Sequence, residues 1–228
     1  MGLLSLIFPK TCFGCGRIGT YFCGLCKKKV VPICVQRCVL CGKASYLGRT
    51  HPSCERKEKI SGLYGVFRYL FPLTHFLAGI KYRLVKEAEN DLTHLLNDHL
   101  PSEVPLWGSS PLFCPIPLHR KRYLERGFNQ AEAVSIFLSQ KYHGVSRDLL
   151  RREKKGTPQA LVDNKEKRRQ NMRGVFEVDN TVKNNHSSIV LVDDVTTTGA
   201  TIEEATKTLI KAGYKKIYGI VVAKAGPD

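Results

Sequence analysis

An acidic pair and a threonine-rich turn follow a short apolar run near the end of the chain. Residues 189–192 are aliphatic, Asp193 and Asp194 come next, and a hydroxyl-rich turn leads into a predicted helix. In open α/β sheets, ligands bind at the carboxyl edge of the strands. Backbone N–H groups and hydroxyls of such a turn bind phosphate, and the carboxylates accept hydrogen bonds from vicinal ribose hydroxyls, directly or through Mg²⁺. The segment predicts a ribose 5-phosphate site made by Asp193, Asp194, Thr196, Thr197, Thr198, Gly199 and Thr201. The alternative is a polar turn whose acidic pair only caps the helix.

Cysteine pairs with a two-residue gap fill the first quarter of the chain. Seven of the nine cysteines and His51 form four pairs: Cys12 with Cys15, Cys23 with Cys26, Cys38 with Cys41, and His51 with Cys54. This spacing lets both members of a pair bind one ion, so the eight ligands predict two tetrahedral zinc sites. The alternative is a set of scattered small hydrophobic residues. Below about 60 residues a module buries too little surface to fold alone, so we expect structural zinc, with no open position for catalysis.

The pairing of these ligands stays open at this level. A tandem arrangement closes loops of 7 and 9 residues between pairs, whereas an interleaved arrangement closes longer ones. Both occur in small zinc modules. Cys34 and Cys114 fall outside the pairs, and we expect Cys114 to lie in a core strand.

Strands and helices alternate after the last cysteine pair. Periodicity predicts strands at residues 62–70, 112–116, 188–194 and 217–224, and helices at residues 73–100, interrupted near 84–88, at 129–142 and at 199–212. Continuous apolar strands joined by amphipathic helices indicate an α/β fold with a parallel sheet covered on both faces. We therefore expect a cysteine-rich zinc-binding module at residues 1–58 and the α/β domain at residues 59–228.

The charge of the chain points to an anionic partner. The 228 residues carry a net charge of +16, of which residues 1–58 hold +8 and residues 119–173 hold +9. Two basic regions fit a phosphate site, a nucleic-acid surface, or both. No stretch approaches the roughly 18 apolar residues of a membrane helix, and residues 2–8 lead into Pro9 and Lys10 without a signal-peptide pattern. We expect a cytoplasmic protein without a membrane span.

Two resemblances sharpen these expectations. The segment VLVDDVTTTGAT resembles the loop of type I phosphoribosyltransferases that binds phosphoribosyl pyrophosphate (PRPP). Nearly the whole chain resembles the ComF/GntX family of competence proteins, in which a cysteine module precedes a type I phosphoribosyltransferase-like domain. The marks of that family are the cysteine pairs, Lys81-Tyr82, Pro115-Ile116-Pro117, residues 126–130, residues 157–159, Arg168, Asn171 and Phe176. His51 stands where the family usually has cysteine, and histidine also binds zinc. The resemblance implies uptake of DNA during natural transformation, with partners in the DNA-import machinery, and no settled reaction.

Basic residues before the acidic pair complete the predicted site. Arg120, Lys121, Arg122 and Arg126 follow the Pro115-x-Pro117 segment and are able to neutralise the pyrophosphate of PRPP. The alternative is that these residues form only a solvent-exposed basic segment that leads into a helix. The resemblance further implies that Lys154 and Lys155 belong to a loop that closes over PRPP. The same charges are able to hold the phosphates of single-stranded DNA, although residues 151–173 contain no aromatic side chain for base stacking.

Three hypotheses follow from these features. The favoured one is a DNA-uptake factor that binds PRPP or a nucleotide, with Mg²⁺, and single-stranded DNA. The second is an active phosphoribosyltransferase in nucleotide salvage or modification, for which the sequence shows no motif that recognises an acceptor. The third is a zinc-dependent adaptor with a vestigial nucleotide fold, which the intact Asp193, Asp194 and threonine turn disfavour.

Overall fold

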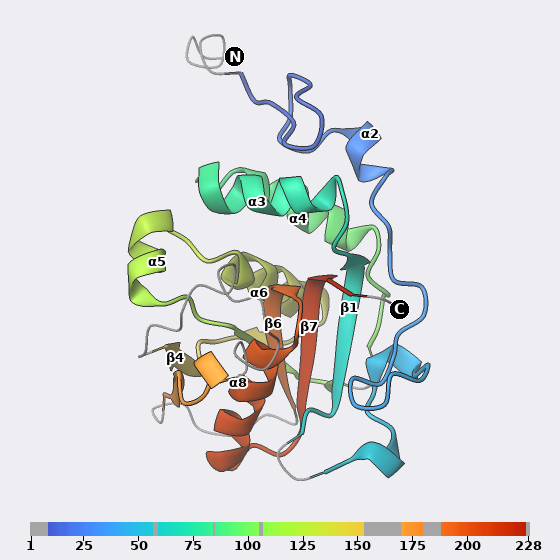
Figure 1. Cartoon of the computed structure of the whole chain (residues 1–228), viewed down its shortest axis with the longest axis vertical. Helices are drawn as coiled ribbons and strands as arrows, with labels where there is room; N and C mark the ends of the chain where they lie inside the picture. The colour runs from blue at the N-terminus through green and yellow to red at the C-terminus, as the bar shows by residue number, and fades with distance from the viewer. Residues whose placement is uncertain are drawn as a thin grey trace.

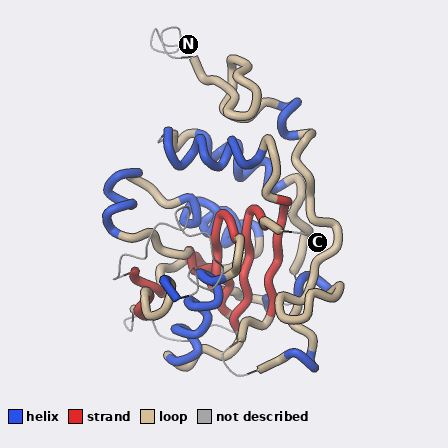
Figure 2. The backbone as a smooth tube through the Cα atoms, in the orientation of Figure 1, coloured by secondary structure: helices blue, strands red, loops and turns tan. Residues whose placement is uncertain are grey.

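A parallel sheet forms the centre of the protein. The structure is a computed structural model that describes residues 9–56, 59–83, 85–104, 107–152, 170–179 and 188–226. Five strands pair in parallel in the order β1-β7-β6-β2-β3 (Figures 1 and 2). Their bounds are β1 Gly62–Arg68, β2 Leu112–Pro115, β3 Val145–Ser146, β6 Ile189–Thr196 and β7 Ile217–Lys224. The predicted α/β fold with a parallel sheet is confirmed.

Helices cover both faces of this sheet because its strands are apolar on both sides. Val190 and Val192 of β6 pack in one core with helices α3 Leu73–Arg83, α4 Ala88–Asn97 and α6 Gln130–Lys141. Ile189 and Leu191 of the same strand face the opposite way and pack in a second core with helix α8 Ala200–Lys211. The side-chain alternation of a strand thus divides one aliphatic run between two cores.

The expected elements lie close to their predicted positions. The predicted interruption near residues 84–88 separates α3 from α4, and strand β7 has its predicted bounds. Strand β6 continues past the acidic pair to Thr196, two residues beyond its expected end. The short helix α5 Arg120–Arg126 was not predicted, and neither was the antiparallel pairing of β4 Leu150–Arg152 with β5 Phe176–Val178.

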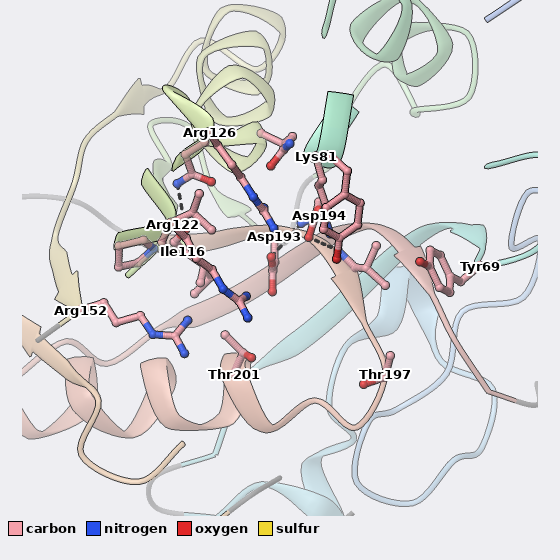
Figure 3. A pocket seen from close by; sticks show the side chains of 16 residues that line it. Tyr69, Lys81, Ile116, Arg122, Arg126, Arg152, Asp193, Asp194, Thr197 and Thr201 are labelled. Atoms are coloured by element: carbon pink, nitrogen blue, oxygen red, sulfur yellow. Dashed lines mark hydrogen bonds and ion pairs between the residues drawn. The ribbon is translucent and has the colours of Figure 1, made fainter. Parts of the chain in front are cut away.

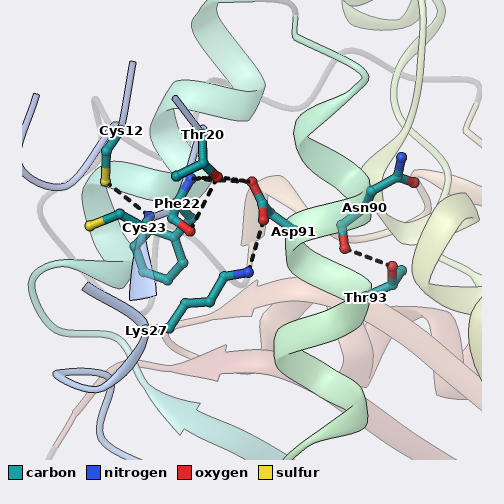
Figure 4. Close-up of polar contacts among 8 residues, drawn as sticks. All are labelled: Cys12, Thr20, Phe22, Cys23, Lys27, Asn90, Asp91 and Thr93. Atoms are coloured by element: carbon teal, nitrogen blue, oxygen red, sulfur yellow. Dashed lines mark hydrogen bonds and ion pairs between the residues drawn. The ribbon is translucent and has the colours of Figure 1, made fainter. Parts of the chain in front are cut away.

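The cysteine-rich segment lies along the domain and also contains short helices, α2 Gly24–Lys27, η1 Tyr46–Gly48 and η2 Pro52–Cys54. Its first half packs on α3 and α4, where Phe22 stacks on Phe76 with ring centroids 4.2 Å apart. Asp91 of α4 accepts hydrogen bonds from the backbone N–H of Phe22 and from the ammonium of Lys27, at 3.2 and 2.8 Å (Figure 4). This half of the segment therefore shares the core of the helices that it covers.

The second half of the cysteine-rich segment pairs with the edge of the sheet. Arg49 bridges to Gly62 of β1, and the buried Thr50 donates its hydroxyl to the Ile60 carbonyl at 2.7 Å. The predicted domain boundary after residue 58 falls on residues 57 and 58, which lie outside the described residues, and stays a prediction. Among the residues that the structure does describe, no helix is long and apolar enough to cross a bilayer.

Candidate ligand pocket and metal centres

A cavity of about 270 Å³ opens at the carboxyl edge of the sheet (Figure 3). Helix α3 lies beyond the carboxyl ends of the central strands, and α5 lies beside them (Figure 1). Strand β6 contributes Asp193 and Asp194, and the turn and first residues of α8 contribute Thr197 and Thr201. The further charged residues of the wall are Lys81, Arg122, Arg126 and Arg152. Segments that are far apart in the sequence thus supply four cations and two carboxylates to one cavity.

The acidic pair is held by its own backbone and by a lysine from α3. The backbone N–H of Asp194 donates to Asp193 Oδ1 at 2.8 Å, and that of Val195 donates to Asp194 Oδ1 at 2.7 Å. Lys81 forms an ion pair with the other oxygen, Asp194 Oδ2. The Lys81 and Asp194 side chains are 21% and 14% exposed, so water screens this pair weakly.

This environment separates the pKa values of the two neighbouring carboxyl groups. Burial, reinforced by the charge of Asp194, raises the pKa of Asp193 well above its usual range. Burial also raises the pKa of Asp194, but the Lys81 ammonium reverses this and holds that pKa below its ordinary value. For Lys81, burial lowers the pKa and the Asp194 carboxylate more than compensates, so the lysine stays charged. The cavity therefore contains an ion pair and one carboxyl group that a cation would help to ionise.

Three arginines face this acidic edge. Arg122 and Arg126 are four residues apart on α5, so both lie on the same side of that helix. Arg152 of β4 approaches from another side, with its guanidinium 5.8 Å from the ring centroid of Phe176. The Arg126 guanidinium lies 5.7 Å from the ring centroid of Tyr82. Burial lowers the pKa of Arg126 and of Arg152, and the charge of Arg122 adds to this effect. An anion in the cavity would relieve the repulsion between these cations.

The threonine turn divides between two surfaces. Gly199 has a φ of +77°, a left-handed conformation that lets the chain turn from β6 into α8. Thr197 and Thr201 line the cavity, whereas Thr196 is a buried strand residue. Thr198 and Gly199 line a separate cavity of about 150 Å³ on the α8 side. Of the seven residues predicted for a ribose phosphate, the structure brings four together: Asp193, Asp194, Thr197 and Thr201.

The predicted basic residues also separate. Arg126 lines the cavity, whereas Arg120 and Lys121 line a shallow hollow on the outer side of α5 with Leu124. Lys154 and Lys155 lie outside the described residues, as do residues 157–159 and Arg168.

Sequence reasoning did not assign Lys81 or Arg152 to the site. Arg122, which the sequence placed with Arg126 in the basic cluster, lines the cavity as Arg126 does, and a helical period across residues 120–126 would have separated these two from Arg120 and Lys121. Lys81 stood out only as a mark of family resemblance, and Arg152 only as part of a long basic stretch.

The predicted metal ligands form two clusters. Cys12, Cys15, Cys23 and Cys26 make the first, and Cys38, Cys41, His51 and Cys54 make the second, with the ligand atoms of each within 4.8 Å of one another. The arrangement is tandem, which resolves the pairing that the spacing left open. Each cluster is able to bind a metal such as zinc. Cys34 belongs to neither cluster, and Cys114 is fully buried in strand β2 as expected.

The donor atoms suit a metal ion chemically. His51 Nε2 lies 3.1 Å from the Ala44 carbonyl oxygen and donates to it, which leaves the lone pair of Nδ1 facing Cys41 Sγ at 3.2 Å. Burial raises the pKa of the Cys12 and Cys38 thiols, but backbone N–H groups directed at their sulfurs more than offset it. The net result lowers the pKa to about 7 for Cys12 and about 6 for Cys38. Both clusters therefore stabilise a thiolate, the form that binds zinc.

No protein-family model matches the chain, but comparison with known proteins identifies several relatives. Competence protein F of Haemophilus influenzae is 32% identical over 163 residues, which cover 70% of this chain and 64% of that protein. Competence protein ComFC of Bacillus subtilis is 27% identical over 206 residues, covering 84% and 78%. DNA utilization protein YhgH of Escherichia coli K12 is 33% identical over 100 residues, covering 43% and 42%. The chain thus spans less than two thirds of the first and third of these proteins. These relatives support the resemblance to the ComF family, and the two cysteine clusters are consistent with the cysteine module of that family.

Proposed function

We propose that the cavity binds a ribose 5-phosphate that also carries a pyrophosphate, as PRPP does, and that the chain takes part in DNA uptake. The observation that carries the proposal is the opposition of charges across one cavity: two carboxylates at the end of β6 face three arginines from α5 and β4 (Figure 3). A sugar needs acceptors for its hydroxyls, and phosphates need cations and N–H donors. One cavity offers both.

Each group has a role in this proposal. Thr197 and Thr201 bind the 5-phosphate at the start of α8, where the helix dipole favours negative charge. Asp193 and Asp194 accept hydrogen bonds from the ribose hydroxyls and would hold Mg²⁺, which neutralises pyrophosphate charge when it is bound. Arg122, Arg126 and Arg152 bind the pyrophosphate oxygens.

Calorimetric titration with PRPP and Mg²⁺ tests this assignment. We expect binding by the wild type and at least a tenfold loss of affinity in Asp193→Asn/Asp194→Asn. Because Asp194 is a largely buried ion-pair partner, Arg122→Ala serves as a second variant, since the Arg122 side chain is partly exposed. Asp98→Asn/Glu103→Gln removes two exposed charges elsewhere and is the control. Wild-type affinity in both pocket variants would refute the ribose-phosphate assignment.

The role in DNA uptake rests on the names of the relatives and on the charge of the chain. Two relatives are named competence proteins and a third a DNA utilization protein. A net charge of +16 favours binding of a polyanion, and single-stranded DNA is the form that we propose. We place the protein in the cytoplasm, in contact with the DNA-import machinery. Loss of transformation on deletion, restored by the wild-type gene but not by the Asp193→Asn/Asp194→Asn variant, is the expected result.

We further propose that both clusters hold structural zinc. Elemental analysis should find two zinc ions per chain, and Cys26→Ser and Cys54→Ser should each lose one. Cys34→Ser is the matched control, because Cys34 lies outside both clusters. A folded chain that holds less than one ion, or loss of metal in Cys34→Ser, would contradict this assignment.

An active phosphoribosyltransferase is the alternative function. The favouring observation is again the opposed charge, since carboxylates near the ribose would stabilise a developing ribosyl cation while the arginines stabilise departing pyrophosphate. A pyrophosphate-release assay with nucleobases and DNA ends as acceptors distinguishes an active transferase from a protein that only binds PRPP. Pyrophosphate release that depends on an acceptor and is abolished in Arg122→Ala would establish turnover. If PRPP binds but no pyrophosphate is released, a binding role alone would be favoured.

A further inference from the structure

A second basic cavity lies at the opposite edge of the sheet from the ligand pocket. It measures about 380 Å³, and its lining includes Ser61, just before β1, and Lys215 and Lys216, just before β7. Because all five strands are parallel, this is the amino edge, whereas Asp193 and Asp194 stand toward the carboxyl edge. The remaining cations of the lining are Arg49, Arg56 and Lys59.

The charges of this cavity are poorly compensated. Lys59 is paired with Glu203 of α8 at 2.8 Å, and Glu55 is the one acidic residue in the lining. Within the described parts of the chain, no ion pair joins Arg49, Arg56, Lys215 or Lys216, all of which are exposed. Like charges gathered around a hollow repel one another and attract a polyanion.

The cavity is also rigidly built. The backbone N–H of Ser61 donates to the Ile217 carbonyl at 2.7 Å, and that of Thr50 donates to the Ser61 carbonyl at 2.8 Å. These bonds join Arg49 to the strand ends that position Lys215 and Lys216. His51 and Cys54 of the second metal cluster border the same loop, so the cluster and the sheet lie on either side of the backbone that carries Arg49. An ordered backbone at this edge reduces the conformational entropy that is lost when the cavity binds phosphate.

We propose that this cavity binds the phosphate groups of a single-stranded nucleic acid, as a site separate from the ligand pocket. The proposal rests on the proposed function, because it gives a location to the strand. A flexible single strand is able to bend its backbone so that its phosphates reach the cations of this cavity.

The test compares two lysine pairs of equal charge. Lys215→Gln/Lys216→Gln removes two cations from the cavity, and Lys28→Gln/Lys29→Gln removes two exposed cations beside the first metal cluster. Fluorescence anisotropy with a labelled 20-nucleotide single strand is measured between 50 and 300 mM salt. We expect about a tenfold loss of affinity for the cavity variant at 100 mM salt. Its slope of log affinity against log salt should be shallower by about 1.4, since each single-strand phosphate contact contributes about 0.7. The control should differ from the wild type by less than twofold.

Other outcomes overturn the proposal in distinguishable ways. Equal losses in both variants would indicate attraction to overall charge, and no loss in either would place the strand elsewhere. Tighter binding of a duplex of the same length, or equal competition by inorganic tripolyphosphate at the same phosphate concentration, would refute the choice of a single strand. Failure of the wild type to bind any oligonucleotide would instead refute strand binding in the proposed function. The cavity variant should bind PRPP as the wild type does, which shows that the ligand pocket is intact.

Discussion

The ion pair between Lys81 and Asp194 joins α3 to the carboxyl edge of the sheet, and Lys81→Met tests its contribution to stability. Removing one partner of a buried pair costs about 3–5 kcal/mol, because the remaining charge loses its compensation. Here the Asp194 side chain is 14% exposed, and its Oδ1 still accepts the Val195 N–H at 2.7 Å. We therefore expect a loss at the lower end, about 3 kcal/mol in the free energy of unfolding.

Urea denaturation at pH 7.5 measures this loss. With a denaturant slope of about 2–3 kcal/mol per molar, the unfolding midpoint should fall by about 1 M. Lys121→Met is the matched control, because Lys121 and Glu125 form an exposed pair at 3.8 Å whose loss should cost less than about 0.5 kcal/mol.

A double variant isolates the pair from general damage. Lys81→Met/Asp194→Asn leaves no unpaired charge, so it should be more stable than Lys81→Met alone by about 1–2 kcal/mol. The reasoning fails if Lys81→Met unfolds at the same urea concentration as Lys121→Met. It also fails if Asp194→Asn deepens the loss instead of relieving it.

Two further predictions concern the packing of α4 and α3. Burial raises the pKa of Glu89 to about 7, and its Oε1 has no hydrogen-bond partner in the described part of the chain. Because the folded state binds this proton more tightly than the unfolded state, the stability contributed by Glu89 is present below about pH 4.5 and is lost as the pH rises through 7. Glu89→Gln should therefore raise the free energy of unfolding by about 2–3 kcal/mol at pH 8 and by little at pH 4.5; an equal gain at both values would contradict this. A methyl group added at Gly79 of α3 would overlap the ring of Phe13, the residue after Cys12 of the first metal cluster. Gly79→Ala should lower the free energy of unfolding by about 1–3 kcal/mol and speed zinc release to a chelator, whereas Gly24→Ala, which meets no neighbour, should not speed release.

Local features carried most of the correct sequence predictions. The strand, the acidic pair and the glycine turn before α8 are consecutive in the chain. They must therefore lie close together in space whatever the rest of the fold. Metal ligands two residues apart are likewise brought together by a single turn. The aliphatic run of β6 predicted a strand buried on both faces, which the two cores confirm.

The sequence by itself thus determined the parallel-sheet fold, the eight residues of the two candidate metal clusters and the acidic edge of the pocket. Tertiary structure decided which cations meet that edge, because Lys81 and Arg152 reach it from elements more than forty residues away in the chain. It also divided one basic run in two: the helical period of α5 turns Arg122 and Arg126 toward the cavity and leaves Arg120 and Lys121 outside. The tandem pairing of the metal clusters was decided in the same way, because packing on α3, α4 and β1 selects between loop closures that spacing allows equally. Contacts along the chain are encoded by spacing, whereas contacts across the fold depend on packing that spacing does not specify.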